Sequence, residues 1–334
     1  MDIQALTALA EAATSQCVGD TSNVAGTGEI AEVARLVLGL PDRLVKSWGP
    51  QLHLGKIEVD GVFCHATPQA FWTDPYNAPH LQHPELCDLL IVLDDYPPHG
   101  ARQRRAFLLQ AKRGQSGMFA VGTGGPSVQR YMYANWPKFD LVGRPLDDLL
   151  NVQLAPPSPG QCPGSRYALV DDTSSPKRWS IEVTQAQPII PSTSFNDYAC
   201  QVLAPIGLGE ALVGMMSGTV GSQCNGDWGC VVAYLLKLAK EREAENRQPA
   251  GVKSSTSGVI LAHSAHASTF VNALPTSASF TLREYPFMHH LLRSQWREDI
   301  RHRSTLMSGD RFEPTEGFGV IHIKIKAGKW RNKG

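Results

Sequence analysis

The stretch that decides the fold is PELCDLLIVLDDYPPHGARQRRAFLLQAK, residues 84–112. Its apolar run Leu86–Leu93 and the later run Ala106–Leu109 have the length and the aliphatic content of buried strands. The segment between these runs, residues 94–105, contains prolines and a glycine and predicts a turn. We therefore expect two neighbouring antiparallel strands joined as a hairpin.

Polar residues interrupt both expected strands. Asp88 lies early in the first strand, and Gln110 and Lys112 lie near the end of the second. Antiparallel pairing brings the start of one strand beside the end of the next, and alternate residues share a face. A carboxylate, an amide and an ammonium among aliphatic residues are costly unless they pair or hold an ion. The pattern predicts that these three groups converge.

This combination of groups is suited to phosphodiester hydrolysis. That reaction needs an activated water and stabilisation of extra negative charge, and a divalent ion held by carboxylates supplies both. Magnesium or manganese prefers carboxylate, amide and carbonyl oxygens. A nearby lysine can stabilise charge on the phosphate or orient the attacking water. We therefore expect a magnesium or manganese site at Asp88.

PELCDLLIV and FLLQAK together resemble the paired strands of the PD-(D/E)XK nuclease superfamily, in the Mrr-type variant in which QxK replaces (D/E)xK. The resemblance covers residues 25–145. It implies an α/β fold with a restriction-endonuclease-like mixed sheet, flanking helices and the core order αβββαβ. It also implies that Asp88 binds the metal, that Gln110 and the Ala111 carbonyl are further ligands, and that Lys112 is the catalytic lysine.

Two further acidic positions remain open. Pro84 is followed by Glu85, and the aspartate comes three residues later, so Glu85 competes with Asp88 for the ligand role. The family often adds a glutamate from its first helix, and here Glu29 or Glu32 could serve, with Glu32 favoured. Each is equally well explained as a solvated acid in the first turn of a helix. The expected catalytic residues are Asp88, Gln110, Lys112 and Glu32, and the expected metal ligands are Asp88, Gln110, Ala111 and Glu85.

The chain is expected to have two parts and a connection. Residues 1–145 form the nuclease-like core, residues 146–165 form a linker or loop rich in Pro and Gly, and residues 166–334 form an α+β region of unknown role. Strands are expected there at YALVD, WSIEVTQ and GVIHIKIK, with a long, mostly helical stretch between residues 195 and 245 and a further helix at HHLLRSQWREDI.

Several local predictions concern the core. Residues 28–48 should form an amphipathic helix that breaks at Pro41. The Asp60-Gly61 pair predicts a hairpin turn between two short strands within residues 52–65. Residues 66–84 read as a loop. VQRYMYANWPKF is expected to be helical up to the residue before Pro137, with FDLVG as the next strand. Gln129 and Arg130 on this helix could contact phosphate, although a surface helix face is the simpler interpretation.

Composition limits the partners. Thirty-one basic and thirty-one acidic residues cancel, so nucleic-acid binding would need a local patch. The seven cysteines form no CxxC pair, which argues against a disulfide framework and a thiolate zinc site. The first residues lack the pattern of a signal peptide, and no apolar run is long enough for a membrane span. We expect a cytoplasmic protein without membrane contact.

The implied function is a metal-dependent DNA endonuclease in defence or DNA processing. Its expected partner is nucleic acid, in the first place double-stranded DNA, with a homodimer or partner defence proteins as further candidates. Two alternatives stay open. One is a non-catalytic binding or regulatory module that keeps the nuclease fold. The other is an enzyme of another class, which a deep polar pocket lined from residues 165–330 would indicate.

Overall fold

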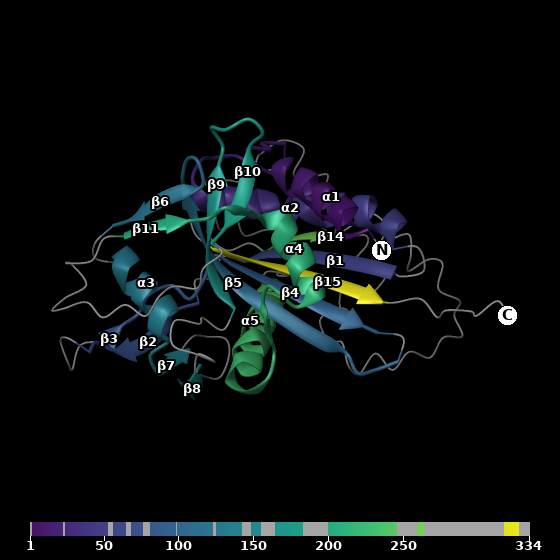
Figure 1. Ribbon diagram of the computed structural model, residues 1–334. Coiled ribbons are helices and arrows are strands. Elements are labelled where there is room, and N and C mark those ends of the chain that lie inside the picture. Colours follow the sequence, from purple (N-terminus) through teal and green to yellow (C-terminus); the bar gives the residue numbers. More distant parts are fainter. Residues whose placement is uncertain are drawn as a thin grey trace.

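A mixed sheet lies at the centre of the protein, with helices on both of its faces (Figure 1). The chain is therefore of the α/β class. The computed structural model describes residues 2–22, 24–52, 56–64, 68–75, 81–97, 99–122, 125–141, 148–154, 164–182, 200–245, 259–263 and 317–326. The expected helix at HHLLRSQWREDI lies outside the described residues.

The central sheet has nine strands in the order β12-β10-β9-β5-β4-β15-β1-β14, with β13 paired to β5. Their bounds are β1 Lys56–Cys64, β4 Leu89–Tyr96, β5 Gln103–Arg113, β9 Ser165–Asp171, β10 Arg178–Ile181, β12 Ile206–Gly207, β13 Ser222–Gln223, β14 Val259–His263 and β15 Phe318–Lys326.

The predicted antiparallel pairing of β4 and β5 is confirmed, with Leu89 opposite Leu109. On the other side of β5, β9 runs parallel to it, and helix α3 (Gly125–Asn135) precedes β9 in the chain. Strand β15, from the end of the chain, lies between β1 and β4, parallel to β4 and antiparallel to β1. Strands β4 and β5 are therefore interior strands, which explains their nearly continuous apolar sequences.

The expected linker does not separate two sheets, because β9, β10 and β15 join the same sheet as β4 and β5. The further strand expected at FDLVG is present as β7 (Phe139–Leu141). It belongs to a separate four-stranded sheet, however, and β9 takes the place beside β5 in the central sheet. All but one residue of β9 is buried, as an interior strand requires. The smaller sheet consists of β3 (Leu81–Gln82), β2 (Ala70–Thr73), β7 and β8 (Leu149–Val152).

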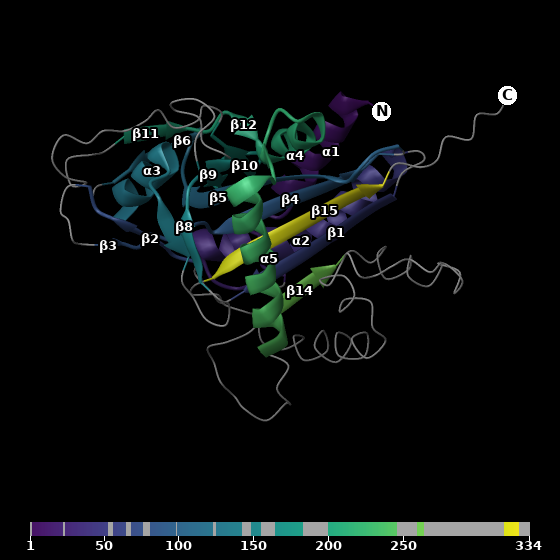
Figure 2. The same ribbon diagram turned by 90° about the horizontal axis from the view of Figure 1, so that it is seen from below.

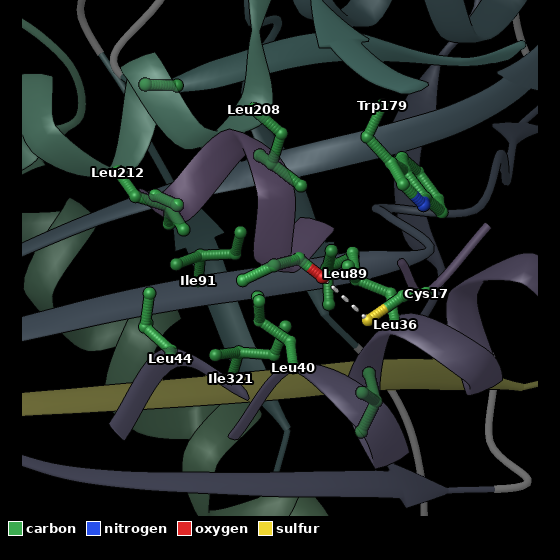
Figure 3. Close-up of a cluster of buried hydrophobic side chains, with 14 of the residues drawn as sticks. Cys17, Leu36, Leu40, Leu44, Leu89, Ile91, Trp179, Leu208, Leu212 and Ile321 are labelled. Atoms are coloured by element: carbon green, nitrogen blue, oxygen red, sulfur yellow. Dashed lines mark hydrogen bonds between the residues drawn. The ribbon is translucent and has the colours of Figure 1, made fainter. Parts of the chain in front are cut away.

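Helices α1 (Ile3–Ser15), α2 (Glu29–Trp48) and α4 (Leu208–Ser217) cover one face of the central sheet. Figure 3 shows the apolar layer there, in which leucines of α2 and α4 meet Leu89, Ile91 and Ile321 from the strands. Helices α3 and α5 (Gly226–Glu245) pack on the opposite face, and Figure 2 shows α5 lying across its strands. A two-stranded sheet of β6 (Met118–Val121) and β11 (Cys200–Leu203), together with the 3-10 turn Gly49–Gln51, completes the described elements.

The predicted helix break at Pro41 and the predicted hairpin turn at Asp60-Gly61 are both wrong. Helix α2 continues through Pro41, and β1 continues through Asp60-Gly61 without a turn. The shared reason is that the two segments pack closely against each other. Pro41 has no N–H, so the carbonyl of Val37 lacks its helical donor. This carbonyl lies against Gly61, where an added Cβ would be only 2.2 Å from its oxygen. Asp60 forms a buried ion pair with Lys324 of β15 at 3.0 Å. Gly61 thus permits close helix packing, and Asp60 helps to hold a neighbouring strand.

The described residues of the expected loop, 68–75 and 81–84, include two strands, β2 and β3 of the smaller sheet. The expected helix before Pro137 is present as α3, which ends at Asn135. The strands expected at YALVD, WSIEVTQ and GVIHIKIK are present as β9, β10 and β15. The stretch from 195 to 245 contains α4 and α5, together with the short strands β11, β12 and β13.

Candidate functional site

Asp88 is fixed at the start of β4 between two neighbouring strands. Its N–H donates to the carbonyl of Leu109 in β5 at 3.0 Å, and its carbonyl accepts from the N–H of Gly319 at 2.8 Å. The residue is 2% exposed. Its backbone is held on both sides, so the position of its side chain is set by the sheet.

The Asp88 carboxylate lies against the end of β5. Oδ2 accepts hydrogen bonds from Gln110 Nε2 at 2.5 Å and from the Ala111 N–H at 2.8 Å. Strand β5 continues beyond the start of β4, so its last residues lack a partner strand on that side. Asp88 takes the place of that strand for Ala111. The predicted adjacency of Asp88 and Gln110 is therefore observed.

A directional chain of amides holds Gln110. Gln129 Nε2, from α3, donates to the Glu85 carbonyl at 2.9 Å and to Gln110 Oε1 at 2.5 Å. A backbone carbonyl can only accept, so it fixes the orientation of the Gln129 amide. That amide in turn directs Gln110 Oε1 away from Asp88 and Nε2 toward it. Gln110 therefore holds Asp88, and it could offer its oxygen to a cation there only after its amide turned.

Lys112 lies two residues beyond Gln110 and pairs with the first helix of the core. Its Nζ is 2.9 Å from Oε2 of Glu29, at the first residue of α2. The other carboxylate oxygen of Glu29 accepts from the Arg113 N–H at 3.1 Å. The Lys112 side chain is 23% exposed. Glu29 and Asp88 thus have the same structural role, because each carboxylate accepts a hydrogen bond from a backbone N–H at the end of β5.

The electrostatics of Asp88 are unusual for an aspartate. Burial is the largest effect and raises the pKa of its carboxyl group to about 7. The positive charge of Lys112 lowers this pKa, whereas the charges of Glu85 and Glu29 raise it. Lys112, Glu85 and Glu29 are therefore all close enough to act on Asp88. Near neutral pH, binding of a cation would displace the proton of this carboxyl group.

The structure places Glu29, and not Glu32, beside the predicted site. Glu32 is buried and forms an ion pair with Arg35 at 2.5 Å. Its second oxygen accepts from the Gly19 N–H at 3.0 Å. Since these contacts hold Glu32 toward α1, Glu29 is the acid of α2 that meets Lys112. Glu85 is exposed and acts on Asp88 through its charge.

Gln129 and Arg130 are not the surface residues that the simpler interpretation of the sequence favours. Both are buried, and Arg130 forms an ion pair with Glu182 at 2.8 Å. Tyr133, one turn after Gln129, donates through its hydroxyl to the Leu86 carbonyl at 2.7 Å. The spacing of Gln129 and Tyr133 at i and i+4 places both on one helix face. That spacing, next to Met132, was the available signal that Gln129 faces inward.

The donor chemistry suits a hard cation. Carboxylates of Asp88, Glu29 and Glu85 lie around the end of β5, and the carbonyl of Ala111 points to the same side as the N–H that binds Asp88. Within the described part of the chain, however, no three His, Cys, Asp or Glu side chains are placed to hold a metal ion together. A cation there would thus depend on Asp88, backbone oxygen and water unless the acids move.

Comparison with known proteins gives no relative: the chain matches no protein-family model, no curated protein and no solved structure. In the described residues, no helix is both long enough and apolar enough to cross a membrane.

Proposed function

We propose that the protein is a metal-dependent nuclease of the restriction-endonuclease-like class and that it cuts DNA. The observation that carries this proposal is the gathering of Asp88, Gln110, Lys112 and Glu29 where β4 begins and β5 ends. Apart from the strands of the two smaller sheets, these elements follow one another as α2, β1, β4, β5, α3 and β9, an order compatible with αβββαβ. Strand β15, between β1 and β4, is an addition to that core.

Each residue has a definite task in this proposal. Bound Mg²⁺ or Mn²⁺ would supply Lewis acidity and lower the pKa of a water molecule. Asp88 would hold the ion together with the Ala111 carbonyl, and Glu29 or Glu85 would add a second carboxylate. Gln110 positions Asp88. Lys112, once separated from Glu29, would place its ammonium group against the phosphate and stabilise the negative charge that develops there.

The substrate and the biological role follow from the family resemblance. Double-stranded DNA is the proposed substrate, and defence or DNA processing is the proposed role. Homodimers or partner defence proteins remain candidate partners. A zero net charge requires a local contact surface for DNA, because the protein as a whole provides no attraction.

A cleavage assay tests the proposal. Purified protein is incubated with plasmid and single-stranded DNA in Mg²⁺, in Mn²⁺ and in chelator. Wild type should cut only with metal, and Lys112→Ala should reduce the rate about a hundredfold or more, as loss of a charge-stabilising donor does. Lys326→Ala is a matched control, because Lys326 forms a similar pair with Glu58 at 3.0 Å. Equal rates for wild type and Lys112→Ala would remove Lys112 from the mechanism.

One observation favours the non-catalytic alternative. Lys112 and Glu29 neutralise each other, and both carboxylates bind N–H groups of β5, so the cluster also serves to finish the sheet. A binding module would retain these contacts without cutting. DNA binding in gel-shift experiments, combined with absence of cleavage in either metal, would favour that alternative over the nuclease.

A further inference from the structure

A pocket of about 560 Å³ opens between α1, α4 and the end of β10. This volume lies within the range of roughly 300–1,000 Å³ that is typical of small-molecule sites. Ile181, Ile206, Val213 and Val220 contribute apolar walls. Ile3 at its edge is 53% exposed, so apolar surface there remains in contact with water. Filling the pocket with an apolar group would remove such surface from water.

The charged side chains of the pocket differ in whether they already have a partner of opposite charge. Glu182 lines it but is already paired with Arg130 at 2.8 Å and accepts from the Tyr167 N–H. Arg166 also lines it, and its Nη1 donates only to the carbonyl of the preceding residue, Ser165, at 2.8 Å. Within the described residues, Arg166 has no carboxylate partner. Glu210 is exposed to water in the first turn of α4, a position that favours a negative charge. The guanidinium of Arg166 is therefore the charge that a ligand could satisfy.

We propose that this pocket binds a small carboxylate ligand with an apolar body, and that Arg166 holds the carboxylate. The planar guanidinium matches a carboxylate through two parallel hydrogen bonds. The apolar walls take the body of the ligand. The proposal does not rest on the nuclease assignment, since neither Asp88 nor Lys112 lines this pocket.

The test compares three eight-carbon probes with different head groups: octanoate, octanol and octylamine. Binding to the full-length protein is measured by titration calorimetry. Octanoate should bind at least tenfold more tightly than octanol, and octylamine should bind most weakly. Arg166→Gln should abolish the advantage of octanoate over octanol. Arg102→Gln is the matched control, because Arg102 directly precedes β5 and does not line the pocket. This variant should leave the advantage of octanoate unchanged.

A second variant tests the location. Ala8 is exposed on α1 and lines the pocket, so Ala8→Trp should fill the opening without disturbing the core. This variant should lose octanoate binding while its thermal unfolding stays close to that of wild type, and it decides the matter if Arg166→Gln does not fold. Equal affinity for octanoate and octanol, unchanged octanoate binding in Ala8→Trp, or absence of octanoate binding to wild type would overturn the proposal. Each of these outcomes is independent of the cleavage assay.

Discussion

Asp88, directly before β4, and Asp94, within β4, are two buried aspartates whose pKa values move in opposite directions. They are six positions apart in the sequence, and an even difference places both on the same face of the sheet. Asp88 is 2% exposed and Asp94 is fully buried. Burial raises the pKa of both carboxyl groups. The difference must therefore come from their partners.

Asp94 is in contact with the charged side chain of Arg104 and with the ring of His322. Arg104 donates to it from Nε at 2.7 Å and from Nη2 at 2.8 Å, and His322 Nε2 lies 2.9 Å from Oδ2. These hydrogen bonds outweigh burial and hold the pKa of Asp94 well below its usual range. Asp88 is contacted by an amide and a backbone N–H, and no cation within the described residues touches it.

Burial alone therefore does not define a functional carboxylate. Asp94 is a structural charge, because its compensation is built into the protein. Asp88 is a carboxylate whose compensation is incomplete, and an added cation would complete it. The contrast between a compensated and an uncompensated aspartate supports placing the proposed metal at Asp88, and the following predictions test it.

The largest expected effect is on stability at Asp94. Asp94→Ala would leave the partly buried Arg104 and the buried His322 without their hydrogen-bond acceptor. Loss of one member of a buried ion pair costs about 3–5 kcal/mol. Urea unfolding of wild type and variant measures this loss. Asp95→Ala, at the neighbouring half-buried position, should cost less than about 1 kcal/mol. Equal losses in the two variants would mean that the Asp94 pairs contribute no special stability.

The second prediction concerns the proposed metal. At a Mn²⁺ concentration a hundredfold above its dissociation constant, the ion should stabilise wild type by about 2.7 kcal/mol. Asp88→Asn should lose this stabilisation, whereas Asp95→Asn should retain it. Urea unfolding with Mn²⁺ and with chelator checks both variants. Undiminished stabilisation of Asp88→Asn would show that the ion binds elsewhere.

Local sequence patterns predicted the contact between Asp88 and Gln110. Strands β4 and β5 are consecutive in the chain, and their apolar runs and turn are all contained in one short stretch. Strand alternation then places Gln110 and Lys112 on one face, and antiparallel pairing brings Asp88 beside them. These relations depend only on nearby residues, so the adjacency of Asp88 and Gln110 could be predicted.

Long-range pairing could not be predicted in this way. Strand β15 takes its place between β1 and β4, where Lys324 meets Asp60 and His322 meets Asp94, across most of the chain. Nothing in the sequence near β1 indicates this partner. The sequence also could not show which of Glu29 and Glu32 meets Lys112, because the outcome depends on Arg35, which forms an ion pair with Glu32. Such contacts are known only once the whole fold is assembled.

The third prediction concerns pH dependence, measured in chelator. The pKa of Asp88 is about 7 in the folded protein, above its usual value of 3.8. Its protonated form therefore stabilises the fold at low pH, and this stability is lost as pH rises through 7. Relative to Asp88→Asn, wild type should lose up to about 1.4 kcal/mol of folding stability per pH unit between pH 4 and 7 and little more above pH 7.

Asp94, with its lowered pKa, should act in the opposite sense, because its contribution to stability is lost below about pH 4. A constant difference between wild type and Asp88→Asn from pH 4 to 8 would contradict the raised pKa.

The smallest expected effect tests the amide chain that positions Asp88. Gln129→Ala would leave Gln110 Oε1 and the Glu85 carbonyl without their shared donor, which should cost about 1 kcal/mol. Asn135→Ala is the matched control, because the Asn135 amide donates to a carbonyl of the same helix at 3.0 Å and has no contact with Gln110. Stability alone would not separate the two variants, since each loses one side-chain amide.

Affinity for Mn²⁺ separates the two variants. Loss of a residue that orients a metal ligand lowers affinity about tenfold or more, so calorimetry should show weaker binding for Gln129→Ala and wild-type binding for Asn135→Ala. If both variants bind Mn²⁺ as wild type does, the chain from Glu85 through Gln129 and Gln110 stabilises the fold without preparing Asp88 for an ion.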